Sequence, residues 1–150
     1  MNLEQLIQVI FGFLGSLGFA ILFNVKGKKM IFASLGGLMS WAFFVVLSYL
    51  IPSEPVCYLI VSIVISIYAE VCARVLKAPT TIFIIISLIP LIPGGSLYYT
   101  VASAFDSSFG VFSEKAIYTL KLAAALALGM IIVLAVWRFF SVRITKNWRN

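Results

Sequence analysis

Histidine is absent from this sequence of 150 residues, and charged residues are scarce, at 11% of the chain. Without histidine the chain lacks the commonest metal ligand and the commonest general base, so we expect no metal site, no cofactor and no catalytic residue. The low charge, an apolar content of 63% and a mean hydropathy of +1.13 exclude a water-soluble globule, in which about one quarter of the residues are charged. The sequence therefore predicts an integral membrane protein.

Cysteine is also rare. Cys57 and Cys72 lie 15 residues apart on one predicted helix. At 1.5 Å per residue this separates them by about 22 Å, too far for a disulfide, and we interpret them as small apolar residues. No serine or cysteine has a plausible base beside it, so an intramembrane enzyme is unsupported and we expect a protein that is not an enzyme.

Long apolar runs are what the sequence has in abundance. A membrane-spanning helix needs about 20 apolar residues, and the sequence offers five such runs, at residues 3–23, 30–51, 56–73, 81–103 and 116–140. Trp137 and Trp148 stand where interfacial aromatic residues would anchor the last run. The segment before the first run is acidic, unlike a cleavable signal peptide, so we expect that run to be retained. We predict an all-α integral membrane protein: a single transmembrane domain over residues 1–150, with five transmembrane helices.

The net charge of +6 is unevenly distributed along the chain. Basic residues concentrate in the first connection, the third connection and the tail, namely Lys26, Lys28, Lys29, Arg74, Lys77, Arg138, Arg143, Lys146 and Arg149. The other connections carry Glu4, Glu54, Asp106 and Glu114, with Lys115 and Lys121. Because connections rich in Lys and Arg stay in the cytoplasm, the pattern predicts the N-terminus outside and the C-terminus inside. We therefore expect a multi-pass protein of the cell inner (cytoplasmic) membrane, with the lipid bilayer rather than nucleic acid as its surroundings.

A polar stripe runs along the third predicted helix. Its members fall within an arc of about 120° on a helix and comprise Ser62, Ser66, Glu70, Arg74 and Lys77. A charge inside a membrane span costs a few kcal/mol unless it faces a partner or a cavity. Two interpretations remain open: Glu70 and Arg74 form an interfacial anchor pair, or Glu70 is a proton-coupling group beside Ser66 with Arg74 and Lys77 in one charge network.

The fourth run contains Pro90, Pro93, Gly94 and Gly95, which together disfavour a continuous helix. We predict that the fourth helix breaks at Pro90–Gly95. Broken helices in transporters present free amides to anionic groups. The candidate substrate-binding residues are therefore Gly94, Gly95, Ser96, Tyr98 and Thr100. The alternative is a simple kink with Tyr98 and Tyr99 in an outer aromatic belt.

Small residues recur at four-residue spacing in three of the runs, which lets helices approach closely. They are Gly12, Ser16 and Ala20, then Gly36 and Ser40, then Ala125 and Gly129. The pattern indicates packing between these helices or against another chain.

Three motifs together carry a resemblance to a known family. They are Phe23-Asn24-Val25, then Tyr68-Ala69-Glu70 followed by Arg74, Lys77 and Pro79, then Ile89-Pro90-Leu91-Ile92-Pro93-Gly94-Gly95 with Tyr98. The chain resembles the short, separately encoded, YjjB-like half of the threonine/serine exporter family. The resemblance implies a five-span subunit that works with a longer membrane subunit and exports threonine and serine or a C4-dicarboxylate such as succinate. Val101 and Ala102 depart from the family pattern, which has Met and an aromatic residue there.

These observations lead to a functional hypothesis. The chain is expected to be one subunit of a secondary exporter that moves small polar carboxylates out of the cell, coupled to protons carried by Glu70. The substrate carboxylate would bind near the broken fourth helix, and Arg74 or Lys77 would attract anionic substrate from the cytoplasm. The alternatives are a non-transporting scaffold subunit that stabilises a larger partner and a homo-oligomeric channel.

Overall fold

Helices joined by short turns make up the part of the chain that the structure describes. The structure is a computed structural model that describes residues 3–106 and 109–147, and the side chains of 3–105 and 109–139. The elements are α1 (Leu3–Leu22), α2 (Lys28–Leu50), α3 (Glu54–Val75), α4 (Thr80–Leu88), the 3₁₀ turn η1 (Ile89–Leu91), α5 (Gly94–Asp106) and α6 (Phe109–Asn147). Helices α1, α2, α3 and α6 are each long and apolar enough to cross a membrane, and α4 with α5 makes a fifth span if the bent pair is counted as one. The predicted fold class is confirmed.

The break in the fourth span lies where the sequence predicted it. Helix α4 ends at Leu88, η1 covers the first proline, and α5 begins at Gly94. Pro90 and Pro93 have no amide hydrogen to donate, and Ile92 between them is extended. The two halves are bent by 59° relative to each other.

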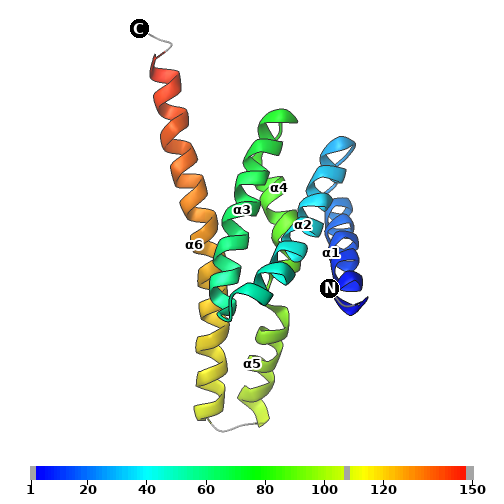
Figure 1. Cartoon of the computed structure of the whole chain (residues 1–150), viewed down its shortest axis with the longest axis vertical. Coiled ribbons are helices and arrows are strands. Elements are labelled where there is room, and N and C mark those ends of the chain that lie inside the picture. Colours follow the sequence, from blue (N-terminus) through cyan, green and yellow to red (C-terminus); the bar gives the residue numbers. More distant parts are fainter. Residues whose placement is uncertain (1–2, 107–108, 148–150) are drawn as a thin grey trace.

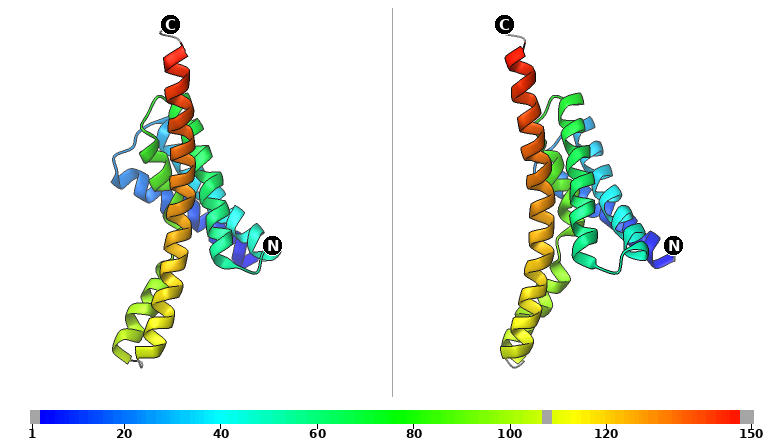
Figure 2. Two further views of the ribbon diagram at one scale, coloured as in Figure 1. Left: turned by 90° about the vertical axis from the view of Figure 1, so that its left-hand side faces the viewer. Right: turned by 60° about the vertical axis from the view of Figure 1, so that its left-hand side comes forward.

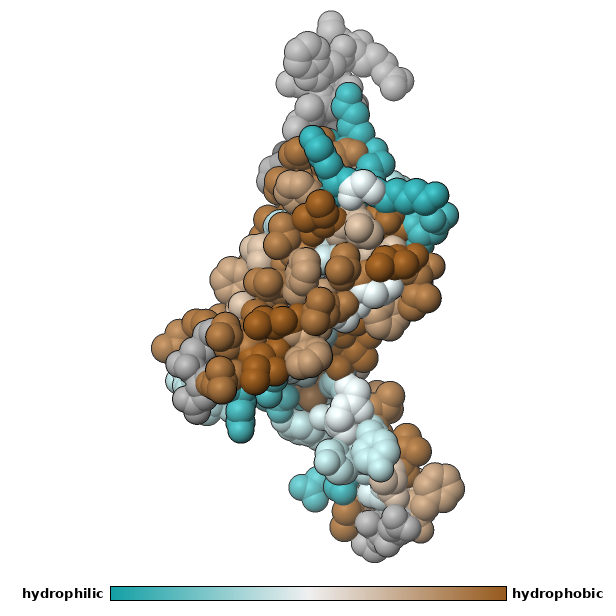
Figure 3. Space-filling model, turned by 90° about the vertical axis from the view of Figure 1, so that its right-hand side faces the viewer, coloured by the Kyte–Doolittle hydropathy of each residue, from teal (hydrophilic) through white to brown (hydrophobic). Residues whose placement is uncertain are grey.

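The helices alternate in direction, as Figures 1 and 2 show. The α1–α2 turn, the α3–α4 turn and the C-terminal part of α6 lie together at the top of Figure 1, and we call this the basic end because it carries Lys26, Lys28, Lys29, Arg74 and Lys77. The α2–α3 turn lies at the opposite end of these helices. Figure 3 shows hydrophilic side chains above and below a largely hydrophobic middle zone. The arrangement matches the alternation of basic and acidic connections in the sequence.

The core lies where α3 packs against α2, α4 and α6. Val61, Ile65, Phe83 and Ile86 are fully buried there. The two free cysteines, Cys57 and Cys72, are also buried. Close approach depends on small residues: a Cβ atom on Gly129 would lie 2.9 Å from the Leu59 carbonyl oxygen and 2.9 Å from the Ser62 Cβ.

Helix α6 is longer than the sequence predicted. The apolar run indicated a start near Ala116, but the helix begins at Phe109 and reaches Asn147. No proline follows Pro93 in the sequence, and Gly110, the one glycine in the turns before Ala116, costs a helix only about 1 kcal/mol, so nothing ends the helix at the edge of its apolar run. The sequence expectations for Trp148 and Arg149 fall outside the described residues, and those for Asp106, Arg143 and Lys146 concern side chains outside the described set.

Two contacts fix how α6 lies beside α3. The Tyr118 hydroxyl donates to the Glu54 carboxylate at the start of α3, and the Arg74 guanidinium lies 4.5 Å from the centre of the Trp137 ring at its end. The part of α6 between Tyr118 and Trp137 therefore runs along the whole of α3. The preceding turns of α6 project past it together with α5, below the other helices in Figure 1.

We call α5 and residues 109–121 of α6 the arm, which comprises the projecting turns and the turn that joins them to α3 through Tyr118, and the rest of the described chain the body. Helix α6 has 39 residues, about 58 Å at 1.5 Å per residue, whereas the hydrocarbon core of a bilayer is about 30 Å thick. The helix is therefore longer than the bilayer core is thick.

Candidate functional site

The polar stripe of α3 runs from the core to the surface. Ser62 and Ser66 are fully buried, and Glu70 is 7% exposed. Arg74 and Lys77, at the basic end, are exposed. The structure thus keeps these residues on one stripe but places only the first three inside the protein.

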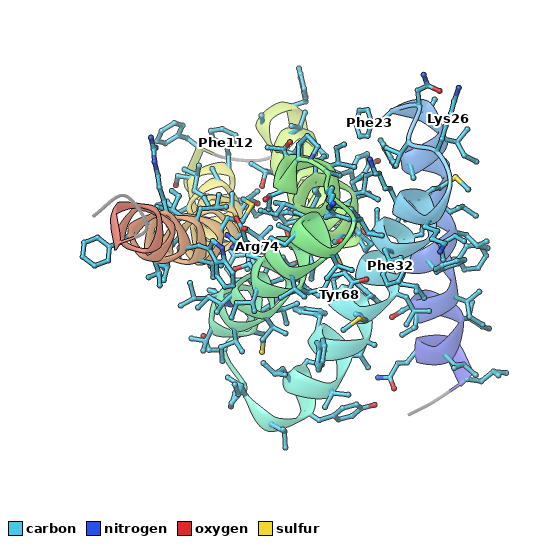
Figure 4. All side chains as sticks on the ribbon, turned by 90° about the horizontal axis from the view of Figure 1, so that it is seen from above. Phe23, Lys26, Phe32, Tyr68, Arg74 and Phe112 are labelled. Atoms are coloured by element: carbon cyan, nitrogen blue, oxygen red, sulfur yellow. The ribbon has the colours of Figure 1, made fainter. Side chains whose placement is uncertain are left out.

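Glu70 and Arg74 form the ion pair that their four-residue spacing indicated. A nitrogen of Arg74 lies 3.8 Å from a carboxylate oxygen of Glu70, with the Arg74 side chain 53% exposed. The same guanidinium packs on the Trp137 ring, so it links α3 to α6; Figure 4 shows Arg74 between the two helices. The exposed arginine holds the buried carboxylate near the basic end.

Ser66 is the unusual member of the stripe. Its hydroxyl oxygen is buried and has no hydrogen-bond partner among the described residues. The Ser62 hydroxyl, in contrast, donates to the Leu59 carbonyl at 2.9 Å. A buried hydroxyl without a partner loses its hydrogen bonds to water and gains none from the protein. It lies one helical turn from Glu70, so this part of α3 holds two buried polar groups with little compensation.

The start of α5 forms the second predicted site. Gly94 and Gly95 are exposed, and a Cβ atom on either would meet nothing within 4 Å. The backbone amide of Leu97 donates to the Pro93 carbonyl at 2.9 Å, so the helix is formed from its first turn. Tyr98 is 68% exposed. The two glycines therefore border open space, and the Gly94 amide donates to the Ile92 carbonyl at 2.6 Å.

Thr100, by contrast, is buried between α5 and α6. Its hydroxyl lies 2.8 Å from the Ser96 carbonyl oxygen, to which it donates, and 2.9 Å from the hydroxyl oxygen of Thr119. The structure places this residue at the contact of the two helices, where its hydroxyl already has partners.

A pocket of about 580 Å³ lies between α5 and α6, and we call it the arm pocket. Its volume falls in the usual range for small-molecule sites, about 300–1,000 Å³. Helix α5 contributes Ser96 and Tyr99. The polar part of the α6 wall consists of Glu114, Lys115, Tyr118, Thr119 and Lys121.

The α6 wall was missed by sequence reasoning, which assigned the substrate site to the segment from Gly94 to Thr100 alone. A signal was present: Glu114, Tyr118 and Lys121 are spaced by four and three residues, which places them on one helix face. Of the predicted residues, only Ser96 lines this pocket. Within the described residues, no group of three or more Cys, Asp or Glu side chains could hold a metal ion.

The two predicted sites are separate in space. A Cβ atom on Gly36 would contact both Tyr68 and Ser87, so these two residues lie at one level of the body. Glu70 follows Tyr68 toward the basic end, whereas Gly94 follows Ser87 in the opposite direction, roughly 10 Å along the chain at helical rise. The carboxylate of α3 and the start of α5 therefore lie at different levels of the structure.

The comparisons with known proteins fit this architecture. The profile of the family described as "Threonine/Serine exporter, ThrE" matches residues 8–136. The match includes the broken span, the polar stripe of α3 and the arm pocket. No curated protein and no solved structure matches the chain.

Proposed function

The chain belongs to this threonine/serine exporter family, and from that premise we propose that it is one membrane subunit of a secondary exporter of small polar carboxylates. It is a multi-pass membrane protein. The proposed substrates are threonine and serine or a C4-dicarboxylate such as succinate, and the proposed location is the cytoplasmic membrane.

The observation that carries this proposal is the broken span with a pocket beside it whose α6 wall carries charged side chains. Irregular backbone inside a membrane is stable only where protein or a water-filled cavity surrounds it, and transporters use such breaks to bind substrate. The amides of Gly95 and Ser96 would bind the substrate carboxylate, and Gly94, whose own amide donates to the Ile92 carbonyl, would leave space for it. Tyr98 is exposed and available as a donor, whereas Thr100 would act through the shape of the α5–α6 contact.

Glu70 is the proposed proton carrier. Its carboxylate is buried, its ion pair with Arg74 is long at 3.8 Å, and the Ser66 hydroxyl one turn away has no partner among the described residues. A protonated Glu70 would avoid the cost of a buried charge, and release of the proton would restore the pair with Arg74. Arg74 and Lys77 would attract anionic substrate at the basic end, which we propose faces the cytoplasm, with the N-terminus outside.

The proposed partner is the longer membrane subunit of the same family. The arm exposes large apolar side chains, with Phe105 85% exposed, and we propose that the longer subunit covers part of this surface. The same surface would also serve a non-transporting scaffold subunit, which is the second candidate function.

Metabolite efflux from cells that lack their own exporters tests the proposal. The cells express this chain alone, the longer subunit alone, or both, and threonine, serine and succinate are measured in the medium. Efflux that requires both chains supports the two-subunit exporter and identifies its substrate. Efflux from this chain alone would indicate a homo-oligomer, and no efflux from the pair would favour the scaffold.

Glu70→Gln separates coupling from assembly. We expect this variant to insert and assemble normally but to lose export that depends on the proton gradient. Glu4→Gln is the matched control, because Glu4 is an exposed acidic residue on α1. Normal export by Glu70→Gln would exclude its role as proton carrier.

Gly95→Leu tests the start of α5 in the same assay. The glycine has open space around it, so the larger side chain fits without strain but covers the amides. Export should fall while complex formation persists. Gly15→Leu on α1, also in open space, is the control. If both variants export normally, the amides of α5 do not bind substrate.

A further inference from the structure

The arm pocket carries charges of both signs on one of its walls. Its α6 wall carries one carboxylate, Glu114, and two ammonium groups, Lys115 and Lys121. A threonine or serine molecule carries one group of each sign, whereas a dicarboxylate carries two negative groups. The pocket therefore has a feature that distinguishes the two proposed substrate classes.

We propose that the arm pocket binds the zwitterionic head of an amino acid, with Glu114 holding the ammonium group and Lys121 the carboxylate, and that Glu114 selects amino acids against dicarboxylates. The inference rests on the proposed export function and adds a second, α6-based site to it.

The position of the pocket suits a site where substrate leaves the membrane. Tyr118, in its wall, is tied to Glu54 at the start of α3, so the pocket lies at the end of the body opposite the basic end. With the basic end in the cytoplasm, the pocket opens to the outside. Ser96 belongs both to this pocket and to the first turn of α5, so the two sites are adjacent.

The walls of the pocket are fixed by contacts outside it. The Tyr118 hydroxyl is engaged with Glu54, and the Thr119 hydroxyl pairs with Thr100, so these two side chains shape the pocket. Glu114, Lys115 and Lys121 are exposed and line the pocket, with Lys121 about two turns along α6 from Glu114. The charged groups are thus the ones free to contact a ligand, and the pocket is large enough for a small amino acid.

Selectivity follows from charge. A dicarboxylate placed with one carboxylate at Lys121 brings its other carboxylate toward Glu114, and like charges brought together in this way suppress binding of the wrong ligand. Removing the charge of Glu114 leaves two lysines, an arrangement that suits two carboxylates. The substitution should therefore lower the affinity for amino acids and raise the affinity for dicarboxylates.

The test measures binding of radiolabelled L-threonine and succinate to the purified full chain, together with the longer subunit, in lipid nanodiscs. We expect Glu114→Gln to weaken threonine binding about tenfold and to strengthen succinate binding. Lys121→Gln should weaken binding of threonine, and threonine methyl ester, which lacks the carboxylate, should not compete. Glu4→Gln and Lys26→Gln, which change exposed charges outside the pocket, are the controls.

Each outcome decides the proposal. Equal threonine affinity in Glu114→Gln and the unchanged chain overturns it, and an equal loss for both ligands overturns the selector role. Glu114→Asp keeps the charge and should keep the preference for threonine. If Glu114→Gln does not assemble, the threonine preference of Glu114→Asp tests the selector role. Failure of the export function itself is recognised differently, because the unchanged pair would then bind threonine without releasing it from cells.

Discussion

The body and the arm are held together in different ways. In the body, hydroxyl groups reach across to neighbouring helices: Ser16 donates to the Ile86 carbonyl at 3.0 Å, Ser87 to the Ala33 carbonyl at 3.3 Å, and Tyr68 to the Phe32 carbonyl at 2.8 Å. In the arm, α5 packs along α6 through the Thr100–Thr119 pair and leaves a pocket beside it. Figure 1 shows this part standing clear of the other helices.

The difference indicates where stability and recognition reside. Lipid supplies no hydrophobic driving force between helices, so their association depends on close contact at small residues and on hydrogen bonds between helices. The body has both. The arm has a pocket with one charged wall, on α6, and strongly exposed aromatic side chains, which suit contact with a substrate and with a partner subunit. The following predictions test this contrast, in order of decreasing effect on stability.

The largest effect is expected from Gly129→Ala in the α3–α6 contact of the body. The added Cβ would overlap the Ser62 side chain and approach the Leu59 carbonyl oxygen to 2.9 Å. Overpacking of this kind costs about 1–3 kcal/mol. The midpoint of thermal unfolding in detergent should fall clearly, whereas Gly15→Ala, in open space, should leave it unchanged. Equal midpoints would mean that this contact does not limit stability.

A smaller effect is expected where the arm is tied to the body. Tyr118→Phe removes the hydroxyl that donates to Glu54, at a cost of about 1 kcal/mol for this exposed bond. Amide hydrogen exchange should rise in α5 and in residues 109–121 but not in the body.

Tyr49→Phe is the control for this experiment, since it removes the bond to Gln5 between α1 and α2 at 2.6 Å and leaves the arm untouched. If Tyr118→Phe speeds exchange equally in arm and body, the two regions do not unfold separately.

At the basic end we expect an effect on stability that is equal to or smaller than that of Tyr118→Phe. Trp137→Leu removes the ring on which the Arg74 guanidinium packs, and a cation–π contact at an exposed site contributes about 0.5–1 kcal/mol. A double-mutant cycle with Arg74→Gln should give a coupling energy in that range. A coupling near zero would show that the tryptophan acts only as an interfacial anchor, the role that the sequence had suggested.

Much of the body could be predicted from the sequence, because its determinants are local. Apolar runs determine which segments enter a membrane, Pro90 and Pro93 remove the amides that a continuous helix needs, and four-residue spacing brings Glu70 to Arg74. Each of these depends on residues close together in the chain.

The arm was harder to predict because its features depend on tertiary structure. Hydropathy determines where a helix is apolar, not where it ends, so the start of α6 at Phe109 was missed. The pocket exists because Thr100 meets Thr119 and thereby places Ser96 and Tyr99 opposite a charged face of α6. The unpaired hydroxyl of Ser66 likewise depends on which helices surround it.

The smallest effect is expected from the Thr100–Thr119 pair. Hydrogen bonds between helices in membrane proteins contribute about 0.6 kcal/mol on average, and Val has nearly the shape of Thr, so Thr100→Val should lower stability by no more than that. Ser16→Ala removes a fully buried bond of the body and should cost at least as much. Thermal unfolding of both variants in the same detergent makes the comparison. A larger loss of stability for Thr100→Val would contradict this contrast between the arm and the body. The arm would then be held as firmly as the body, and it could not open locally to adapt to a substrate.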